Sequence, residues 1–170
     1  FMTSVTVTNE STCSVNESRV PKTEIRLCTL DEFKVKADPL FQEHYEEIAL
    51  RKDLMELKPN WPMYDVLDQS GSLFIYLAMQ GDVCIGYSMN LVANHLHYAD
   101  LKYSQNDVLF IKKEFRGGRI GLRLMKITEE HAKSLGCKVM LWHAKERTTL
   151  AALLPRLKYG VQDIMFSKEL

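Results

Sequence analysis

The sequence has no excess of either charge and no long apolar run. Its 22 lysine and arginine residues balance 22 aspartate and glutamate residues, so no net field favours nucleic acid or a membrane surface. No stretch approaches the roughly 18 apolar residues of a transmembrane helix, and the first residues lack the apolar core of a secretion signal. We therefore expect no nucleic-acid partner, no membrane partner and a cytoplasmic location.

Cysteine is sparse and has none of the spacings typical of metal ligands. The four cysteines are isolated from one another along the chain, at Cys13, Cys28, Cys84 and Cys137. Two of them lie inside apolar runs, which favours buried free thiols in a reducing compartment over disulfides. We expect no metal ion.

The chain length of 170 residues suits a single domain with a real core. Residues 1–22 are rich in Ser, Thr, Val and Asn, and their weak periodicity predicts a flexible lead-in. Residues 23–170 form the expected domain. No repeat or low-complexity segment interrupts them.

Strand and helix periodicities alternate along this domain. The expected strands are 24–30, two runs within 72–98 around the hairpin signal Gly81-Asp82, then 108–113, 137–144 and 161–170. The expected helices are one from Asp38 to Pro59, one over 119–135 and one over 148–158, with a short helix within 60–71 left open. The carboxylate of Asp38 is expected to cap the first helix, which should turn Phe41, Tyr45, Ile48 and Ala49 inward. This order predicts an α/β fold with a mixed sheet.

Two glycines and two arginines crowd residues 116–119, between an apolar strand and a periodic helix. Such a turn leaves the first backbone N–H groups of the helix unpaired at the positive end of its dipole, which is a geometry that binds phosphate. The arginines would add charged hydrogen bonds. An ordinary turn is the alternative, because the segment lacks the Lys-Ser/Thr of a P-loop and does not follow the first strand of a Rossmann unit.

The segment "DVLFIKKEFRGGRIGLRLMKITEEHAKSLGCKVMLWH" resembles the acyl-CoA-binding core of the GNAT superfamily of N-acetyltransferases. In that family an Arg/Gln-x-x-Gly-x-Gly/Ala turn follows the fourth strand and holds the CoA pyrophosphate. The ending "LLPRLKYGVQDIMFSKEL" is similar to the family's closing "LYEKLGF" helix and last strand. More narrowly, "HLHY", "FRGGRIGLRLM" and "LWH" resemble acetyltransferase-like proteins encoded by bacteriophages. The resemblance implies flanking helices and a sheet splayed between strands 4 and 5.

The resemblance also implies a site for acetyl-CoA, the co-substrate of the family. Arg116 takes the Arg/Gln position of the motif and Gly121 the final Gly/Ala position. Gly117, Gly118 and Ile120 fill its variable places. The implied site therefore begins with the turn itself.

Further cofactor contacts follow from the same resemblance. Arg119 stands where the family usually has glycine, so its backbone N–H is kept while its side chain turns outward or over a phosphate. The backbones of Phe110, Ile111 and Lys112 would pair with the pantetheine arm. His143 would lie beside the gap where CoA enters, or else be a structural histidine packed by its neighbour.

A basic cluster coincides with the glycine turn. Its members are Lys112, Lys113, Arg116, Arg119 and Arg123. A solvated surface is one interpretation, and the CoA phosphates are the one that the glycine turn favours. A nucleic-acid-binding module is a further alternative, and this cluster is the only feature that supports it. Its affinity for nucleic acid would fall steeply with salt concentration.

The resemblance does not supply the usual catalytic acid. Many GNAT enzymes use a tyrosine in the closing helix, where this chain has Leu154. Histidine titrates in the right range for a base, and His95 and His97 alternate on an expected strand, facing a turn that leads to Asp107. We predict His97, before His95, as the general base, with Asp107 orienting an imidazole; a solvated pair at a hairpin end, or a metal site with a third ligand, is the alternative. Tyr159 matches the aromatic of "LGF" and is a candidate acid or a core residue.

The function predicted from these residues is transfer of an acetyl group from acetyl-CoA to an unidentified amine, on a small molecule or a protein, by direct attack in a ternary complex. Tyr45, Trp61 and Tyr64 lie in the region that forms a substrate wall in the family, although core packing also explains Tyr45. The absent tyrosine supports a rival function, an acyl-CoA-binding or interaction protein without catalysis. The sequence leaves a homodimer open.

Overall fold

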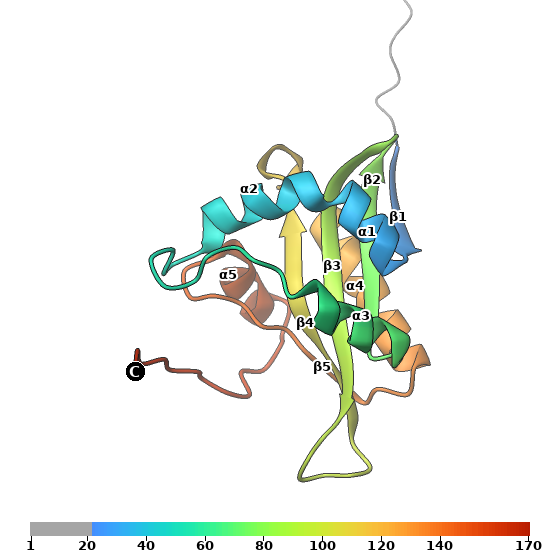
Figure 1. Ribbon diagram of the computed structural model, residues 1–170. Coiled ribbons are helices and arrows are strands. Elements are labelled where there is room, and N and C mark those ends of the chain that lie inside the picture. Colours follow the sequence, from blue (N-terminus) through green and yellow to red (C-terminus); the bar gives the residue numbers. More distant parts are fainter. Residues whose placement is uncertain (1–21) are drawn as a thin grey trace, which may run out of the picture.

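The computed structural model describes residues 22–170 of the protein. Residues 1–21, which make up nearly all of the predicted lead-in and include Cys13, lie outside the described residues. Within the described part, five strands form one sheet in which each strand neighbours the next along the chain (Figure 1). They are β1 (Thr23–Cys28), β2 (Leu73–Gln80), β3 (Val83–Asn94), β4 (Lys102–Ile111) and β5 (Val139–Leu141).

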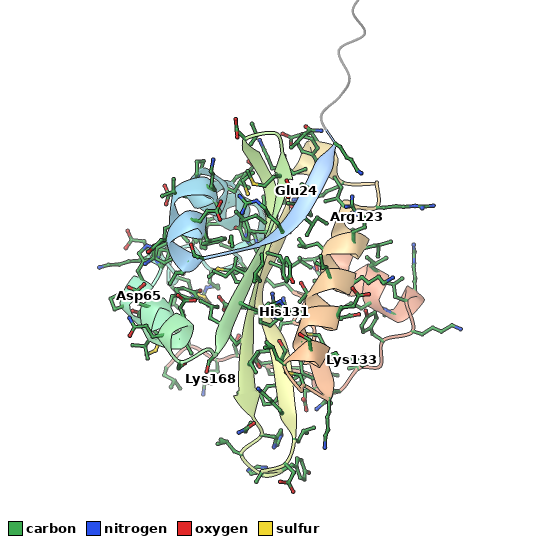
Figure 2. All side chains as sticks on the ribbon, turned by 90° about the vertical axis from the view of Figure 1, so that its right-hand side faces the viewer. Glu24, Asp65, Arg123, His131, Lys133 and Lys168 are labelled. Atoms are coloured by element: carbon green, nitrogen blue, oxygen red, sulfur yellow. The ribbon has the colours of Figure 1, made fainter. Side chains whose placement is uncertain are left out.

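Helices cover both faces of this sheet, as the edge-on view in Figure 2 shows. One face carries α1 (Leu30–Lys36), α2 (Asp38–Ile48) and α3 (Trp61–Gln69). The other carries α4 (Ile120–Ser134), with the end of α5 (Thr149–Arg156) beside it. Strands β1 to β4 are antiparallel and β5 is parallel to β4. The mixed α/β sheet with flanking helices confirms the predicted fold class.

Helix α1 was not predicted, although its start signal is present in the sequence. The side chain of Thr29 caps the helix by accepting the N–H of Glu32 at 3.2 Å. Thr and Glu three residues apart are the pair found in a capping box. Here the Glu32 carboxylate is bonded by Arg26 of β1, which joins the helix to the sheet. The residues 29–30 that we assigned to a strand therefore begin a helix.

Helix α2 begins where it was predicted but differs in its cap and its length. Ala37 is the N-cap residue and makes no side-chain bond, so Asp38 is the first helical residue rather than the cap. The helix ends at Ile48 because Ala49 is extended, with ψ of 119°. The predicted end at Pro59 is wrong, since the chain leaves the helix long before the proline.

Helix α4 matches its prediction to within one residue at each end. Four of its side chains are buried, namely Leu124, Met125, Thr128 and Ala132. Leu135 lies beyond the helix and is exposed. Gly136 follows with φ of 85°, a left-handed conformation that suits glycine at a helix end.

The sheet splays between β4 and β5, as predicted. The parallel pairing runs only from Tyr103 with Val139 to Gln105 with Leu141. At the next position the Asn106 side chain holds the backbone of His143, accepting its N–H at 2.5 Å and donating to its carbonyl at 3.2 Å. Residues 107–111 of β4 continue past this bridge without a β5 partner. A gap therefore opens beside the end of β4.

The predicted strand over residues 161–170 is wrong, because this segment has no regular secondary structure. Ile164, Met165 and Phe166 are all exposed. Three apolar residues in succession do not alternate, so no single face of a strand could bury them. A side-chain bond of 2.8 Å between Glu169 and Arg51 ties the segment to the loop after α2. The fifth strand is also shorter than the predicted 137–144.

Gly86 of β3 allows the end of β4 to approach closely. A Cβ at this position would lie 2.6 Å from the Phe110 carbonyl oxygen and 2.4 Å from Ile111 Cδ1. We expect Gly86→Ala to lower the free energy of unfolding by about 1–3 kcal/mol, because the β4 backbone would have to move. Urea unfolding measures this. Gly160→Ala is the matched control, because open space surrounds its Cβ position; equal stability of both variants would contradict the prediction.

Candidate functional site

The candidate site lies where β4 passes through the glycine turn into α4. Gly117 has φ of 86°, a left-handed conformation that glycine adopts without strain. A Cβ at Gly118 or Gly121 would meet open space, so packing within the described chain requires glycine at neither position. Bare backbone at a helix start is instead what an approaching anion needs. The turn therefore presents bare backbone to open space.

The start of α4 is electrostatically open to an anion. Arg119 is its N-cap residue and makes no side-chain cap bond, and within residues 22–170 no side chain is seen to bond the free N–H groups of the first turn. No acidic residue lies in that turn. Arg119 and Arg123 are both exposed, and Figure 2 labels Arg123 on the first turns of the helix. The helix dipole and the two guanidinium groups would thus both attract an anion to the start of α4.

Arg116 is engaged within the protein. Its Nε donates to the Ile111 carbonyl at 2.7 Å, and its two terminal nitrogens bond the two carboxylate oxygens of Glu47 on α2 at 2.5 and 2.7 Å. Its guanidinium also lies over the Phe110 ring, 5.3 Å from the centroid. The bonds from Arg116 hold the pKa of Glu47 below its usual value. Arg116 therefore joins β4, the turn and α2, and its side chain is not free in this structure.

The side of β4 that each N–H and C=O group faces limits which of the predicted residues can pair with pantetheine. Lys112 N–H donates to the Ile85 carbonyl at 2.9 Å, so it faces β3 and not the gap. Backbone groups alternate in direction along an antiparallel strand, so Phe110 also faces β3, while Ile111 and Leu109 face the gap. The structure thus corrects the expected run of three pairing residues. Of those three, only Ile111 directs its backbone to the gap.

The last turns of α2 bridge this gap. Glu47 bonds Arg116, which follows β4, and the carbonyl of Ile48 accepts a bond of 2.9 Å from Lys145, which follows β5. One turn earlier, the ring of His44 stacks on Phe110 with centroids 4.6 Å apart. The end of α2 is therefore tied to the segments that follow both strands, and His44 packs on β4 one turn before.

His44 is a buried residue that the sequence analysis missed. Leu40 and His44 are the buried positions of α2, whereas the predicted set of Phe41, Tyr45, Ile48 and Ala49 is only partly buried. The predicted stripe was placed one position off around the helix. His44 Nδ1 lies 2.8 Å from the hydroxyl of Tyr87, which is fully buried on β3. Burial lowers the pKa of His44 to about 4, so its imidazole is neutral near pH 7.

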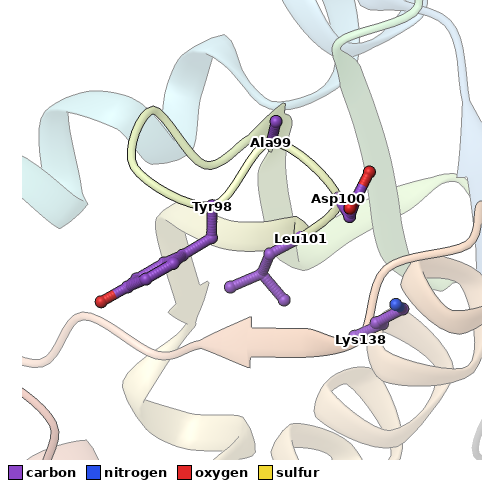
Figure 3. Close-up of a pocket in the computed structure, with 5 residues that line it drawn as sticks. All are labelled: Tyr98, Ala99, Asp100, Leu101 and Lys138. Carbon is purple, nitrogen blue, oxygen red and sulfur yellow. The ribbon is translucent and has the colours of Figure 1, made fainter.

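The two predicted base residues lie in the turn between β3 and β4. Strand β3 ends at Asn94, so His95 and His97 do not alternate on a strand as expected. His97 N–H donates to His95 Nδ1 at 3.1 Å. The same turn forms one wall of a shallow hollow at the start of β5, lined by Tyr98, Ala99, Asp100, Leu101 and Lys138 (Figure 3).

Asp107 does not meet these histidines. Its carboxylate accepts a hydrogen bond from the Tyr64 hydroxyl on α3. Five residues of β4 separate Asp107 from Lys102 at the hairpin end, about 17 Å along a strand. The structure therefore does not bring together the predicted histidine and its orienting carboxylate, because Asp107 lies midway along β4 while the histidines lie in the hairpin before this strand begins.

Tyr159 packs between α5 and α4. Its hydroxyl donates to the Glu129 carboxylate, which Trp142 Nε1 also bonds at 2.8 Å. Burial and the carboxylate raise the pKa of Tyr159 to about 12. The hydroxyl of this candidate acid therefore gives up its proton less readily than an ordinary tyrosine does. His143 is exposed two residues after β5 ends, with its backbone fixed by Asn106.

The three aromatic residues of the expected substrate wall lie on the α2 and α3 side of the sheet. The Tyr45 hydroxyl donates to the Met55 carbonyl at 2.9 Å. Trp61 packs against Phe41 and Tyr64, with centroid distances of 5.8 and 5.6 Å. All three are partly buried. Trp61 and Tyr64 pack against the hydrophobic core on this face of the sheet.

Residues 22–170 contain neither a cluster of metal ligands nor a membrane-spanning helix. No group of three or more His, Cys, Asp or Glu side chains in this range is placed to hold a metal ion. Within the same residues, no helix is both long and apolar enough to cross a membrane.

Comparison with known proteins identifies the family. The model of a family described as "Acetyltransferase (GNAT) family" matches residues 35–158, more than half of the chain. A search of curated proteins gave no match.

Solved structures resemble the chain over most of its length. An aminoglycoside acetyltransferase from an uncultured soil metagenomic sample, in complex with trehalose, is 14% identical, with 87% of this chain and 96% of that chain covered and a TM-score of 0.68. A ribosomal-protein-alanine N-acetyltransferase from Brucella melitensis biovar Abortus 2308 is 14% identical, with 88% and 99% covered and a TM-score of 0.64. A transcriptional regulator from Bacillus halodurans is 15% identical, with 88% and 100% covered and a TM-score of 0.69. At these identities the likeness shows the fold alone.

Proposed function

Since the chain belongs to the GNAT acetyltransferase family, we propose that it transfers the acetyl group of acetyl-CoA to an amine by direct attack in a ternary complex. The observation that carries this proposal is the unpaired end of β4, which leads through a bare glycine turn into a helix start free of acidic residues. A strand edge suits an extended amide-containing arm, and the helix start suits a pyrophosphate. Acetyl-CoA contains both groups.

The proposed cofactor contacts follow the geometry of the turn. Backbone N–H groups of Gly117, Gly118, Ile120 and Gly121 would face the pyrophosphate, with Arg119 and Arg123 supplying charge. Leu109 would offer the pantetheine arm its backbone groups that face the gap, and Ile111 would offer its N–H, because Arg116 already bonds the Ile111 carbonyl. Arg116 would act by fixing α2 and the turn. His143 would lie beside the entrance.

The proposed reaction needs a neutral amine beside the thioester. The amine nitrogen attacks the carbonyl carbon, the C–N bond forms, the C–S bond breaks, and a proton passes from nitrogen to the leaving sulfur. His97 or His95 as general base stays a prediction from the sequence, and either would require an acceptor that extends to the β3–β4 turn. Tyr159 as acid likewise stays a prediction.

The acceptor is proposed to be a primary amine on a small molecule or a protein. One structural neighbour is described as an aminoglycoside acetyltransferase, also crystallised with sisomicin, and another as a ribosomal-protein-alanine N-acetyltransferase. These names support an amine and leave its size open. The free thiols of Cys28, Cys84 and Cys137 support a reducing, cytoplasmic location. Kinship with phage-encoded proteins stays a prediction from the sequence.

The test combines binding with turnover. Calorimetry with acetyl-CoA is expected to show saturable binding at one site per chain. Release of the CoA thiol is then followed against a panel of amines, including aminoglycosides, polyamines and peptides with free N-termini. Binding together with amine-dependent thiol release supports the proposal, and absence of acetyl-CoA binding by the folded protein contradicts it.

A second function has support from the closing helix. Leu154 occupies the position of the usual tyrosine, and the nearby Tyr159 hydroxyl is committed to Glu129. An acyl-CoA-binding protein without catalysis would have no need for a free acid here. This alternative predicts the same calorimetric binding but no thiol release with any amine.

Arg119 provides a further prediction. Its side chain is exposed and has no ion pair among the described residues, so it is available for a phosphate. Arg119→Ala is expected to weaken acetyl-CoA binding by about 1–3 kcal/mol, the range of a charged hydrogen bond, and Arg119→Gly should weaken it similarly. Calorimetry measures both, with Lys133→Ala at the far end of α4 as control. Undiminished affinity in Arg119→Gly would show that the side chain only faces solvent.

A further inference from the structure

The sheet carries two histidine–tyrosine–phenylalanine groups of nearly the same geometry, one on each face. On the α2 side, His44 Nδ1 lies 2.8 Å from the Tyr87 hydroxyl and its ring stacks on Phe110 at 4.6 Å. On the α4 side, His131 Nδ1 lies 2.9 Å from the Tyr76 hydroxyl and its ring stacks on Phe74 at 4.6 Å. The two groups differ in their place relative to the gap between β4 and β5.

His44 lies at the gap and His131 lies away from it. Phe110, under the His44 ring, belongs to the part of β4 that has no β5 partner. One turn further along α2, Glu47 holds Arg116. His131 lies on the last turns of α4, eleven residues or about 16 Å from the start of that helix. Figure 2 labels it on α4, facing the sheet.

The hydroxyl of Tyr87 determines which nitrogen of His44 carries the proton. Tyr87 is fully buried, and its hydroxyl has no hydrogen-bond partner other than His44 among the described residues. If Nδ1 were the donor, the hydroxyl proton would be left without an acceptor, which is costly in a buried site. Tyr87 therefore donates to Nδ1, and the neutral imidazole carries its proton on Nε2.

The Nε2–H group of His44 is left without a hydrogen-bond partner in the described part of the chain. By contrast, every buried side-chain nitrogen or oxygen of the described residues does have one. Nε2 is therefore not fully buried, although only 6% of the residue is exposed. A side-chain hydrogen-bond donor, on a ring fixed by Tyr87 and Phe110, is thus left without a partner beside the unpaired end of β4.

We propose that His44 is a catalytic residue, whose Nε2–H donates a hydrogen bond to the acetyl carbonyl oxygen as negative charge develops on it during transfer. This inference rests on the proposed function, since it assigns a role at the same site. A fixed donor aimed at developing charge, in a site with little water, is an effective device for stabilising a transition state. A neutral imidazole is known to polarise a carbonyl in this way in another enzyme.

The proton balance of the reaction is unaffected by this role. The amine loses one proton and the leaving sulfur gains one, while His44 keeps its own proton throughout. The charges that face His44 are Glu47 on α2, Arg116 after the turn and Lys145 after β5. The two cations favour the neutral ring and Glu47 opposes them, while burial dominates. A neutral donor, rather than a base that must become charged, is the role that this environment permits.

The kinetic test compares the two matched histidines. His44→Asn places an amide oxygen near the Nδ1 position, where it can still accept from Tyr87, but has no group at Nε2. We expect the rate of acetyl transfer to fall by about 100-fold. The rate is measured as release of the CoA thiol, with the amine found by screening as acceptor or, without one, with water as acceptor. Acetyl-CoA affinity should stay within about threefold. His131→Asn makes the same change in the matched group and should turn over as the wild type does.

A second measurement does not depend on turnover. In protein labelled with ¹⁵N-histidine, the His44 signals, assigned by their loss in His44→Asn, should show the Nε2–H tautomer. Acetyl-CoA should shift the Nε2 signal more than CoA does, because only acetyl-CoA offers the carbonyl. In Tyr87→Phe the fixed tautomer should be lost, which a purely packing role of Tyr87 would not produce.

The outcomes separate this inference from the proposed function. Acetyl-CoA binding and transfer that persist undiminished in His44→Asn would overturn the role of His44 and leave the function standing. An Nε2 signal that acetyl-CoA leaves unchanged would also overturn it. A folded wild-type protein that binds no acetyl-CoA would overturn both.

Discussion

Gly121→Glu is expected to abolish acetyl-CoA binding. The substitution places a carboxylate in the first turn of α4, where the free N–H groups and the exposed Arg119 and Arg123 face the proposed pyrophosphate. Two like charges about 4 Å apart near a protein surface repel by about 4 kcal/mol. This corresponds to a loss of about 1,000-fold in affinity. Calorimetry should therefore detect no binding at concentrations that saturate the wild type.

The variant is expected to fold, which makes its loss of binding interpretable. Gly121 does not have positive φ, and open space surrounds its Cβ position. An acidic residue in the first turn also suits the helix dipole. Gly160→Glu is the matched control, because it adds the same charge at a glycine with open space outside the site. Wild-type affinity in a folded Gly121→Glu protein would place the cofactor elsewhere.

The turn and the strand before it could be predicted because their signals are local. The apolar run 108–111, the glycines at 117 and 118 and the periodicity of 120–134 are contiguous, and each is decided by neighbours within one or two turns. The splay also followed from the family resemblance. By contrast, a strand over 161–170 would need a sheet edge to pair with. Whether the segment reaches such an edge is decided by the tertiary structure and not by local sequence.

The contacts that complete the site could not be predicted from local signals. Glu47 and Arg116 are 69 residues apart, and His44 and Tyr87 are 43 apart. Asp107 was expected to meet a histidine, but α3 brings Tyr64 to it instead. Each pairing is decided by where a helix lies on the sheet. The one available signal was the spacing of Leu40, His44 and Glu47, which places them along one side of a helix.

The folded protein is also expected to lose stability in mild acid because of His44. Its pKa is about 4 when folded, against about 6.5 in an unfolded chain. The unfolded state then binds more protons between these values, so the free energy of unfolding falls as the pH falls through this window. The expected loss is about 2 kcal/mol between pH 7 and pH 5 and about 3 kcal/mol by pH 4.

Urea unfolding at successive pH values in His44→Asn tests this expectation, because the variant has no imidazole at position 44. Its stability should be nearly flat between pH 7 and pH 5 apart from the smaller contribution of His131, whose pKa burial also lowers. Carboxylates with lowered pKa values, such as Glu47, add their own loss only at lower pH. An equal acid slope in wild type and His44→Asn would show that His44 gains a proton without cost. The neutral imidazole on which the proposed donor role depends would then lose its physical basis.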